Sequence, residues 1–77
     1  MTNRLITSDP RVMVGKPIIA GTRITVELIL EKLMSGDSIA DILDAYPHLT
    51  RQGIAAAIEF ARESVADLSV YPVPADA

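Results

Sequence analysis

The chain has 77 residues, of which 49% are hydrophobic, with a net charge of −3 and no cysteine. This length is enough for one small domain, near the lower limit at which a single core keeps a chain folded. The lack of cysteine excludes disulfides and thiol chemistry, and no apolar run reaches the roughly 20 residues that cross a bilayer. The first residues are too polar for a signal peptide, so we expect a cytoplasmic protein without a membrane partner.

The charges are unevenly distributed along the chain. Residues 1–25 carry four cations and one acid, a net charge of +3, whereas residues 26–77 carry three cations and nine acids, a net charge of −6. The basic head can pair with the acidic body within a dimer, or it can meet phosphate. The acidic body argues against strong non-specific DNA binding, which needs cations along the nucleic-acid backbone.

A short β element is predicted at residues 15–25. Ile and Thr favour extended backbone, and this segment places them on both sides of Ala20-Gly21-Thr22. Gly21 adopts a positive φ at little steric cost, which suits a tight turn. Pro17 lacks a backbone donor and suits a strand start or an edge. We therefore expect two short strands joined by this turn.

A first helix is predicted between Thr25 and Gly36. Thr25 is the expected N-cap, Glu27 lies in the first turn, where the helix dipole favours an acid, and Gly36 is the expected left-handed cap. Apolar residues recur at the spacing of one buried helical stripe. They are Val26, Ile29, Leu30 and Leu33.

Two more helices follow. Ser38 and Asp41 have the spacing of a weak capping box, with Ile39, Ile42 and Leu43 facing inward, and Tyr46-Pro47 ends this second helix. Thr50 is the expected cap of the third helix, and Gly53 in its first turn favours fraying. The predicted buried stripe of the third helix is Ile54, Ala57, Ile58, Ala61 and Val65.

These elements predict a mainly α fold, with a short N-terminal β element followed by a three-helix, helix-turn-helix-like bundle. Generic three-helix packing explains the same pattern. We expect one domain over residues 1–68, with the β element at 1–25 and the helical core at 26–68, and a C-terminal tail at 69–77. We also expect a homodimer in which the apolar strands of the head pair or pack across a two-fold axis.

The segment from Gly15 to Val26 reads Gly-Lys-Pro-Ile-Ile-Ala-Gly-Thr-Arg-Ile-Thr-Val, and Gly36-Asp37-Ser38 and Tyr46-Pro47-His48-Leu49-Thr50 follow downstream. Together these motifs closely resemble the small bacterial domain-of-unknown-function family 433, over about residues 6–61. The resemblance implies a homeodomain-like helical core and an antitoxin role similar to that of VapB-type antitoxins, whose toxins are PIN-type ribonucleases. Ala20 stands where the family often has a cation, and Gly53 stands near a common acid, so transfer of a DNA-contact surface is weakened.

Four residues are candidates for contact with DNA. Arg51 and Gln52 begin the third helix, the usual place for base-edge contacts, although a solvated first turn explains them equally. Lys16 and Arg23 can touch phosphate from the β element. The alternative, which we favour, is that Arg23 pairs with an acid of the helical body or of a second subunit.

No set of residues points to catalysis, a metal or a cofactor. His48 is the single histidine and lies in a turn, and Asp41 with Asp44 is typical of a solvated helix face. We therefore expect a binding protein and not an enzyme.

The tail offers a candidate partner-binding segment, because an aromatic between prolines is a good anchor and antitoxin tails commonly order on binding. A frayed end is the alternative. The segment consists of Val70, Tyr71, Pro72 and Val73.

The leading hypothesis, which rests on the resemblance, is an antitoxin-like protein that sequesters a small PIN-type ribonuclease and binds its own promoter DNA. The alternatives are a stand-alone helix-turn-helix regulator and a structural interaction module without a nucleic-acid role.

Overall fold

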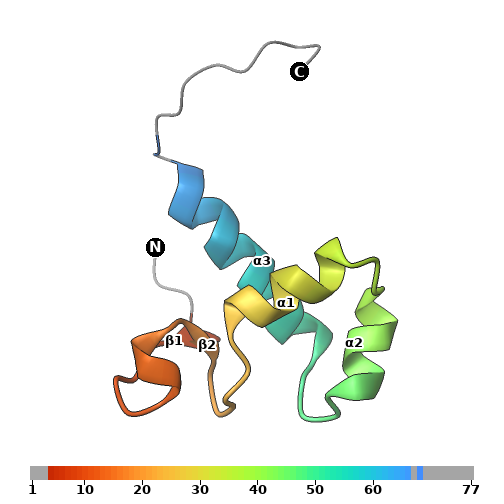
Figure 1. The fold of residues 1–77 in the computed structure, drawn as a ribbon, viewed down its shortest axis with the longest axis horizontal. Coiled ribbons are helices and arrows are strands. Elements are labelled where there is room, and N and C mark those ends of the chain that lie inside the picture. The colour runs from red at the N-terminus through yellow and green to blue at the C-terminus, as the bar shows by residue number, and fades with distance from the viewer. Residues whose placement is uncertain (1–3, 67, 69–77) are drawn as a thin grey trace.

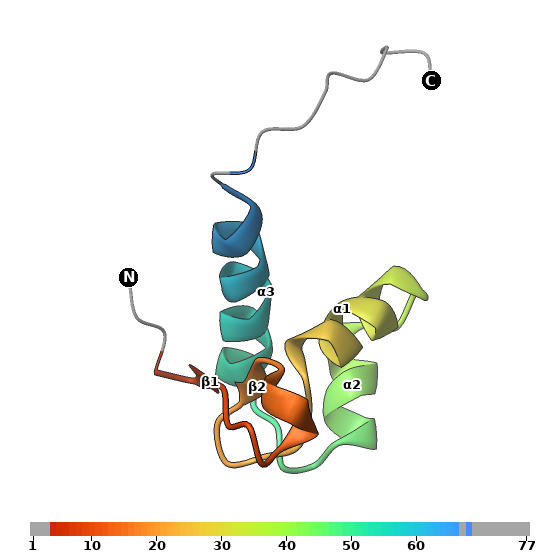
Figure 2. The same cartoon turned by 60° about the vertical axis from the view of Figure 1, so that its left-hand side comes forward.

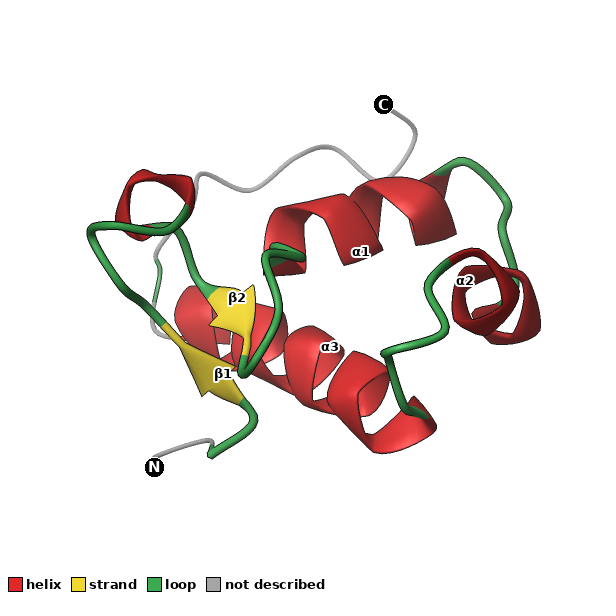
Figure 3. Ribbon diagram, turned by 90° about the horizontal axis from the view of Figure 1, so that it is seen from below, coloured by secondary structure: helices red, strands yellow, loops and turns green. Residues whose placement is uncertain are grey.

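The computed structural model describes residues 4–66 and residue 68. A two-stranded β element precedes three helices, which confirms the predicted mainly α fold class (Figure 1). The elements are β1 (Ile6–Thr7), a 3₁₀ turn η1 (Met13–Gly15), β2 (Ile18–Ile19), α1 (Val26–Met34), α2 (Ile39–Ala45) and α3 (Arg51–Ala66). Seen from below, α1 and α3 lie one above the other, with the strands at one end and α2 at the other (Figure 3).

The β element differs from the predicted hairpin. β2 pairs antiparallel with β1, where Ile6 faces Ile19, and its other side makes only an isolated bridge from Ile18 to Thr25. The turn at Gly21 is present, with a φ of 79°. The second predicted strand is reduced to the bridge at Thr25. Backbone hydrogen bonds still join the two sides of the turn, from the Ile19 N–H to the Ile24 carbonyl and from the Val26 N–H to the Pro17 carbonyl.

The loop between the strands contains unusual backbone. Met13 and Val14 have φ values of 51° and 56°, and Gly15 follows at 80°. The left-handed region is unfavourable for a β-branched residue such as Val14. The Ser8 hydroxyl donates a hydrogen bond to the Gly15 carbonyl, which closes this loop onto the end of β1.

Both ends of α1 are capped as predicted. The Thr25 hydroxyl accepts a hydrogen bond from the Leu28 N–H at 2.9 Å. At the other end Gly36, with a φ of 99°, donates its N–H to the Leu33 carbonyl. Asp37 donates to the Lys32 carbonyl at 3.0 Å, which completes a Schellman motif.

The predicted capping box of α2 is also present. The Ser38 hydroxyl accepts from the Asp41 N–H at 3.0 Å, and the Asp41 carboxylate accepts from the Ser38 N–H at 2.9 Å. Because the Ser38 backbone N–H and hydroxyl both contact it, the pKa of Asp41 is lowered. The helix ends at Ala45, with Tyr46 as its C-cap before Pro47.

The start of α3 is capped and packed against the head of the domain. The Thr50 hydroxyl accepts from the Gly53 N–H at 3.0 Å, as expected of a cap. Gly53 itself is buried, and a Cβ built on it would lie 3.5 Å from Ile19 Cγ2. Gly53 therefore lies against the head of the domain and not in solvent, and fraying at this end of the helix stays a prediction.

The core lies where the three helices meet β2. Its buried cluster consists of Ile19, Val26, Ile29, Ile42, Leu49, Ile54 and Ala57. Ile18 and Ile19 are only 3% and 6% exposed within one chain. The prediction that the apolar head strands pack across a two-fold axis is therefore wrong for these side chains, because they already fill the core of their own chain.

Three residues of the predicted buried stripes lie outside this core. Leu30 is 38% exposed, Ile58 39% and Val65 58%. For Val65 the reason is geometric, since the C-terminal turns of α3 extend past the other elements of the fold (Figure 2). These side chains therefore contribute to the surface.

Candidate functional site

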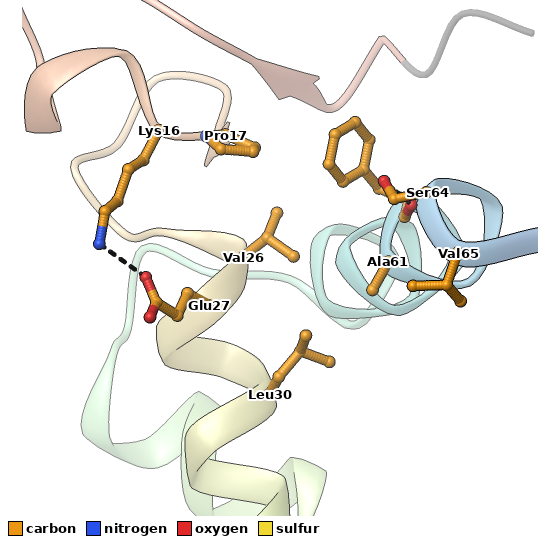
Figure 4. A pocket seen from close by; sticks show the side chains of 9 residues that line it. Lys16, Pro17, Val26, Glu27, Leu30, Ala61, Ser64 and Val65 are labelled. Atoms are coloured by element: carbon orange, nitrogen blue, oxygen red, sulfur yellow. Dashed lines mark hydrogen bonds and ion pairs between the residues drawn. The ribbon is translucent and has the colours of Figure 1, made fainter. Parts of the chain in front are cut away.

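The candidate DNA-binding residues do not form one cluster. Arg51 and Gln52 are both exposed in the first turn of α3, and Arg23 is exposed in the turn after β2. The β2–α1 connection and the α2–α3 loop lie at the same edge of the fold, the lower edge of Figure 1. Lys16 is separate from this edge, since its side chain is directed at α1 (Figure 4).

Lys16 is engaged by an acid of α1. Its Nζ lies 2.7 Å from Glu27 Oε1, and this contact lowers the pKa of Glu27, first through the hydrogen bond and then through the opposite charge. Within the part of the chain that the structure describes, the other ion pair joins Arg11 to Asp9. Lys16, and not Arg23, is thus the cation that pairs with an acid of the helical body within the described residues, and pairing of Arg23 with a second subunit stays a prediction.

An apolar groove opens beside this ion pair, between α1, α3 and the segment before β2. Its volume is about 390 Å³. Figure 4 shows Val26 and Leu30 directed across it toward the C-terminal turns of α3. Its lining residues are Lys16, Pro17, Val26, Glu27, Leu30, Phe60, Ala61, Ser64 and Val65.

The lining of this groove is mostly apolar. Its only charged lining residues, Lys16 and Glu27, neutralise each other at the rim. A concave apolar surface with few polar groups favours contact with apolar side chains over contact with phosphate or a polar small molecule.

A second surface is acidic. The segment from Val26 to Ala45, which forms α1 and α2, carries five carboxylates and one lysine, a net charge of −4. Glu27 is paired with Lys16 and Asp41 caps α2, whereas Glu31 and Asp44 are exposed. An exposed negative surface of this kind attracts a cationic partner.

The remaining candidates contribute less. His48 is exposed in the turn after Pro47, in agreement with a turn role. Among residues 4–66 and 68, no three His, Cys, Asp or Glu side chains gather as metal ligands would. The candidate partner-binding segment from Val70 to Val73 lies outside the described residues.

Sequence reasoning missed the groove. Its signal was present, because Leu30 and Val65 lengthen two apolar stripes beyond what one small core can cover. Periodicity predicts every residue of these stripes to be buried. It shows which residues share a helix face but not where the packing on that face ends.

A protein-family match covers most of the chain. Residues 6–61 match the family described as Protein of unknown function (DUF433). The chain belongs to the DUF433 family. The match covers the β element and most of the helical core, and it ends at Ala61, before Ser64 and Val65 on the outer side of the groove.

A solved DUF433 protein has the same fold. The chain is similar to the crystal structure of a DUF433 member protein from Anabaena variabilis, with a TM-score of 0.76 and 27% sequence identity. The likeness covers 80% of this chain and 61% of that one.

A second relative is much longer than this chain, and the match covers only part of it. The uncharacterized protein y4eO of Sinorhizobium fredii is 32% identical over 57 residues, which are 74% of this chain. The matched region spans about a quarter, 26%, of that relative. Within the described part of the DUF433 chain, no helix has the length and apolar character needed to cross a membrane.

Proposed function

We propose that this DUF433 protein is an antitoxin-like binding protein that sequesters a small ribonuclease and performs no catalysis itself. The observation that carries the proposal is the excess of carboxylates in the segment from Val26 to Ala45, whose net charge is −4, or −3 once Lys16 is counted with its partner Glu27. Enzymes that bind RNA present cations to its phosphates. A negatively charged helical surface is complementary to such a basic cleft.

Two exposed acids make this surface accessible to a partner. Glu31 lies on α1 and Asp44 near the end of α2, and both project into solvent. Opposite charges on two partners increase the association rate and oppose wrong orientations. The acidic surface therefore accounts for fast capture, while apolar contacts supply lasting affinity.

The family resemblance supports the same role. Gly15 to Val26 and Tyr46 to Thr50 carry the motifs that resemble a family regarded as similar to VapB-type antitoxins, whose toxins are PIN-type ribonucleases. A PIN-type ribonuclease is therefore the partner that we propose, and the cytoplasm is where the pair would act.

The test is inhibition of a co-purified ribonuclease by the full chain and by charge variants. We expect the tagged chain to recover one PIN-type nuclease in fixed stoichiometry, and the Glu31→Gln/Asp44→Asn variant to inhibit it at least tenfold more weakly at low salt. The matched control is Glu59→Gln/Glu63→Gln, which removes the same charge from α3. Equal inhibition by all three proteins would exclude the acidic surface as the binding site.

A second candidate function is binding to promoter DNA. Arg51 and Gln52 are exposed at the N-terminal end of α3, and the exposed Arg23 belongs to a turn at the same edge of the fold. Side chains at the start of a recognition helix are placed for base-edge contacts.

Fluorescence anisotropy with the chain's own promoter fragment tests this second function. Arg51→Ala should weaken binding by about 1–3 kcal/mol if Arg51 reads a base edge. Arg62→Ala, near the far end of α3, is the control and should bind as the unchanged protein does. Affinity that does not fall with added salt would contradict a DNA-binding role.

A further inference from the structure

The apolar stripe of α3 continues beyond the core that it helps to form. Along this stripe the exposed fraction rises from 0% at Ile54 to 39% at Ile58, 58% at Val65 and 64% at Leu68. Leu68 lies just after the helix and stays attached to its last turn, because its N–H donates to the Val65 carbonyl at 3.1 Å. The last turns of α3 therefore present apolar side chains that nothing in the described part of the chain covers fully.

The spacing of these residues is characteristic of helix pairing. Successive steps of four, three, four and three residues separate Ile54, Ile58, Ala61, Val65 and Leu68. Alternating steps of this kind, about 3.5 residues on average, keep one apolar seam facing a second helix. Ile54 is already buried in the core of its own chain and Leu68 lies just past the end of α3 at Ala66, so the part of this seam open to a second helix consists of Ile58, Ala61 and Val65.

The groove lies directly beside this seam. Ala61 and Val65 belong to both, and Leu30 of α1 forms the opposite wall (Figure 4). Ala61 is small and half-buried, so a second helix can approach α3 closely at this point.

Charge favours a second copy of the chain as the source of that helix. α3 carries Arg51 and Arg62 against Glu59 and Glu63, so its net charge is zero. By contrast, the segment from Val26 to Ala45, which includes α1, α2 and Asp37 between them, carries −4, and two such surfaces would repel each other. The α3 surface is thus the one on which two copies can meet without like-charge repulsion.

We propose that two copies of this chain pair through antiparallel α3 helices, with Ala61 near the two-fold axis. In this arrangement Ile58 of each copy lies opposite Val65 of the other, and each α3 covers the groove of its partner. The same patch serves on both copies, as a closed two-fold interface requires. The inference does not depend on the proposed binding of a ribonuclease, which uses the acidic surface of α1 and α2.

Sedimentation equilibrium of the full chain, over micromolar to millimolar concentrations, tests the proposal. The unchanged protein should have twice the chain mass of 8.3 kDa. Val65→Glu should sediment as a monomer, or dissociate at least a hundredfold more readily. The matched control is Ala66→Glu, which adds the same charge to the same turn, about 100° around the helix, and should remain dimeric.

Circular dichroism of both variants checks that their helices are kept, so that a monomer is not attributed to unfolding. A monomeric unchanged protein, or a Val65→Glu protein as dimeric as Ala66→Glu, would overturn the proposal. A dimer that survives Val65→Glu and is lost on Tyr71→Ser would assign the contact to the C-terminal segment and not to α3.

Discussion

Lys16 Nζ lies 2.7 Å from Glu27 Oε1, so an ion pair joins the segment before β2 to the first turn of α1. Glu27 is also placed where the helix dipole favours a negative charge. Both side chains are largely exposed, at 55% and 71%, so water and salt weaken their attraction.

The Lys16–Glu27 pair gives the stability of the protein a pH dependence. Because folding lowers the pKa of Glu27, the carboxylate stabilises the folded state above its ordinary pKa, and this contribution is lost as the pH falls through the lowered value. We expect Glu27→Gln to lower Tm slightly at pH 7 in low salt, and we expect this difference in Tm to shrink as the pH is lowered below the ordinary pKa of a glutamate. A gap in Tm that persists at low pH, or in about 1 M salt, would show that the pair is not its cause.

The capping box of α2 predicts a larger effect. Ser38→Ala removes the hydroxyl that accepts from the Asp41 N–H and should lower the free energy of unfolding by about 1 kcal/mol. Ser35→Ala is the control, because the Ser35 hydroxyl only donates to the Glu31 carbonyl at the end of α1. Urea denaturation compares the two, and equal losses would contradict a specific capping role.

The strained loop before β2 offers a stabilising substitution. Val14 has a φ of 56° and is 92% exposed, so its side chain adds little packing to offset an unfavourable backbone. Asn tolerates the left-handed region, so Val14→Asn should raise the free energy of unfolding by about 1 kcal/mol. Val12→Asn, at a position with extended backbone and a half-buried side chain, should not stabilise.

Two glycines should respond to alanine with opposite signs. Gly53 lies in α3 and has room for a Cβ at 3.4 Å from Thr50 Oγ1, so Gly53→Ala should stabilise by up to about 1 kcal/mol. Gly36 has a φ of 99°, so Gly36→Ala should destabilise by a similar amount, about 1 kcal/mol. Thermal unfolding of both variants is the measurement, and a destabilised Gly53→Ala would show that Ile19 cannot make room.

The helices could be predicted because their signals are local. Thr25, Ser38 and Thr50 each accept a hydrogen bond from an N–H three residues later, and this spacing is visible in the sequence. Ile29 and Ile42 are buried because helical periodicity places them on the inner face.

The strand pairing and the groove could not be predicted because both depend on distant segments. Ile6 pairs with Ile19 across a loop that reverses through positive φ at Met13 and Val14, and neither residue type signals such a turn. Leu30 and Val65 have the periodicity of buried residues, and only the three-dimensional fold shows that α3 extends past the core.

The contact between Ile19 and Gly53 also constrains the order of folding. The buried face of β2 remains uncovered until α3, more than thirty residues later in the chain, has been synthesised and has docked. During translation the segment from Gly15 to Val26 therefore stays exposed to solvent. Exposed apolar segments of this kind favour aggregation of nascent chains.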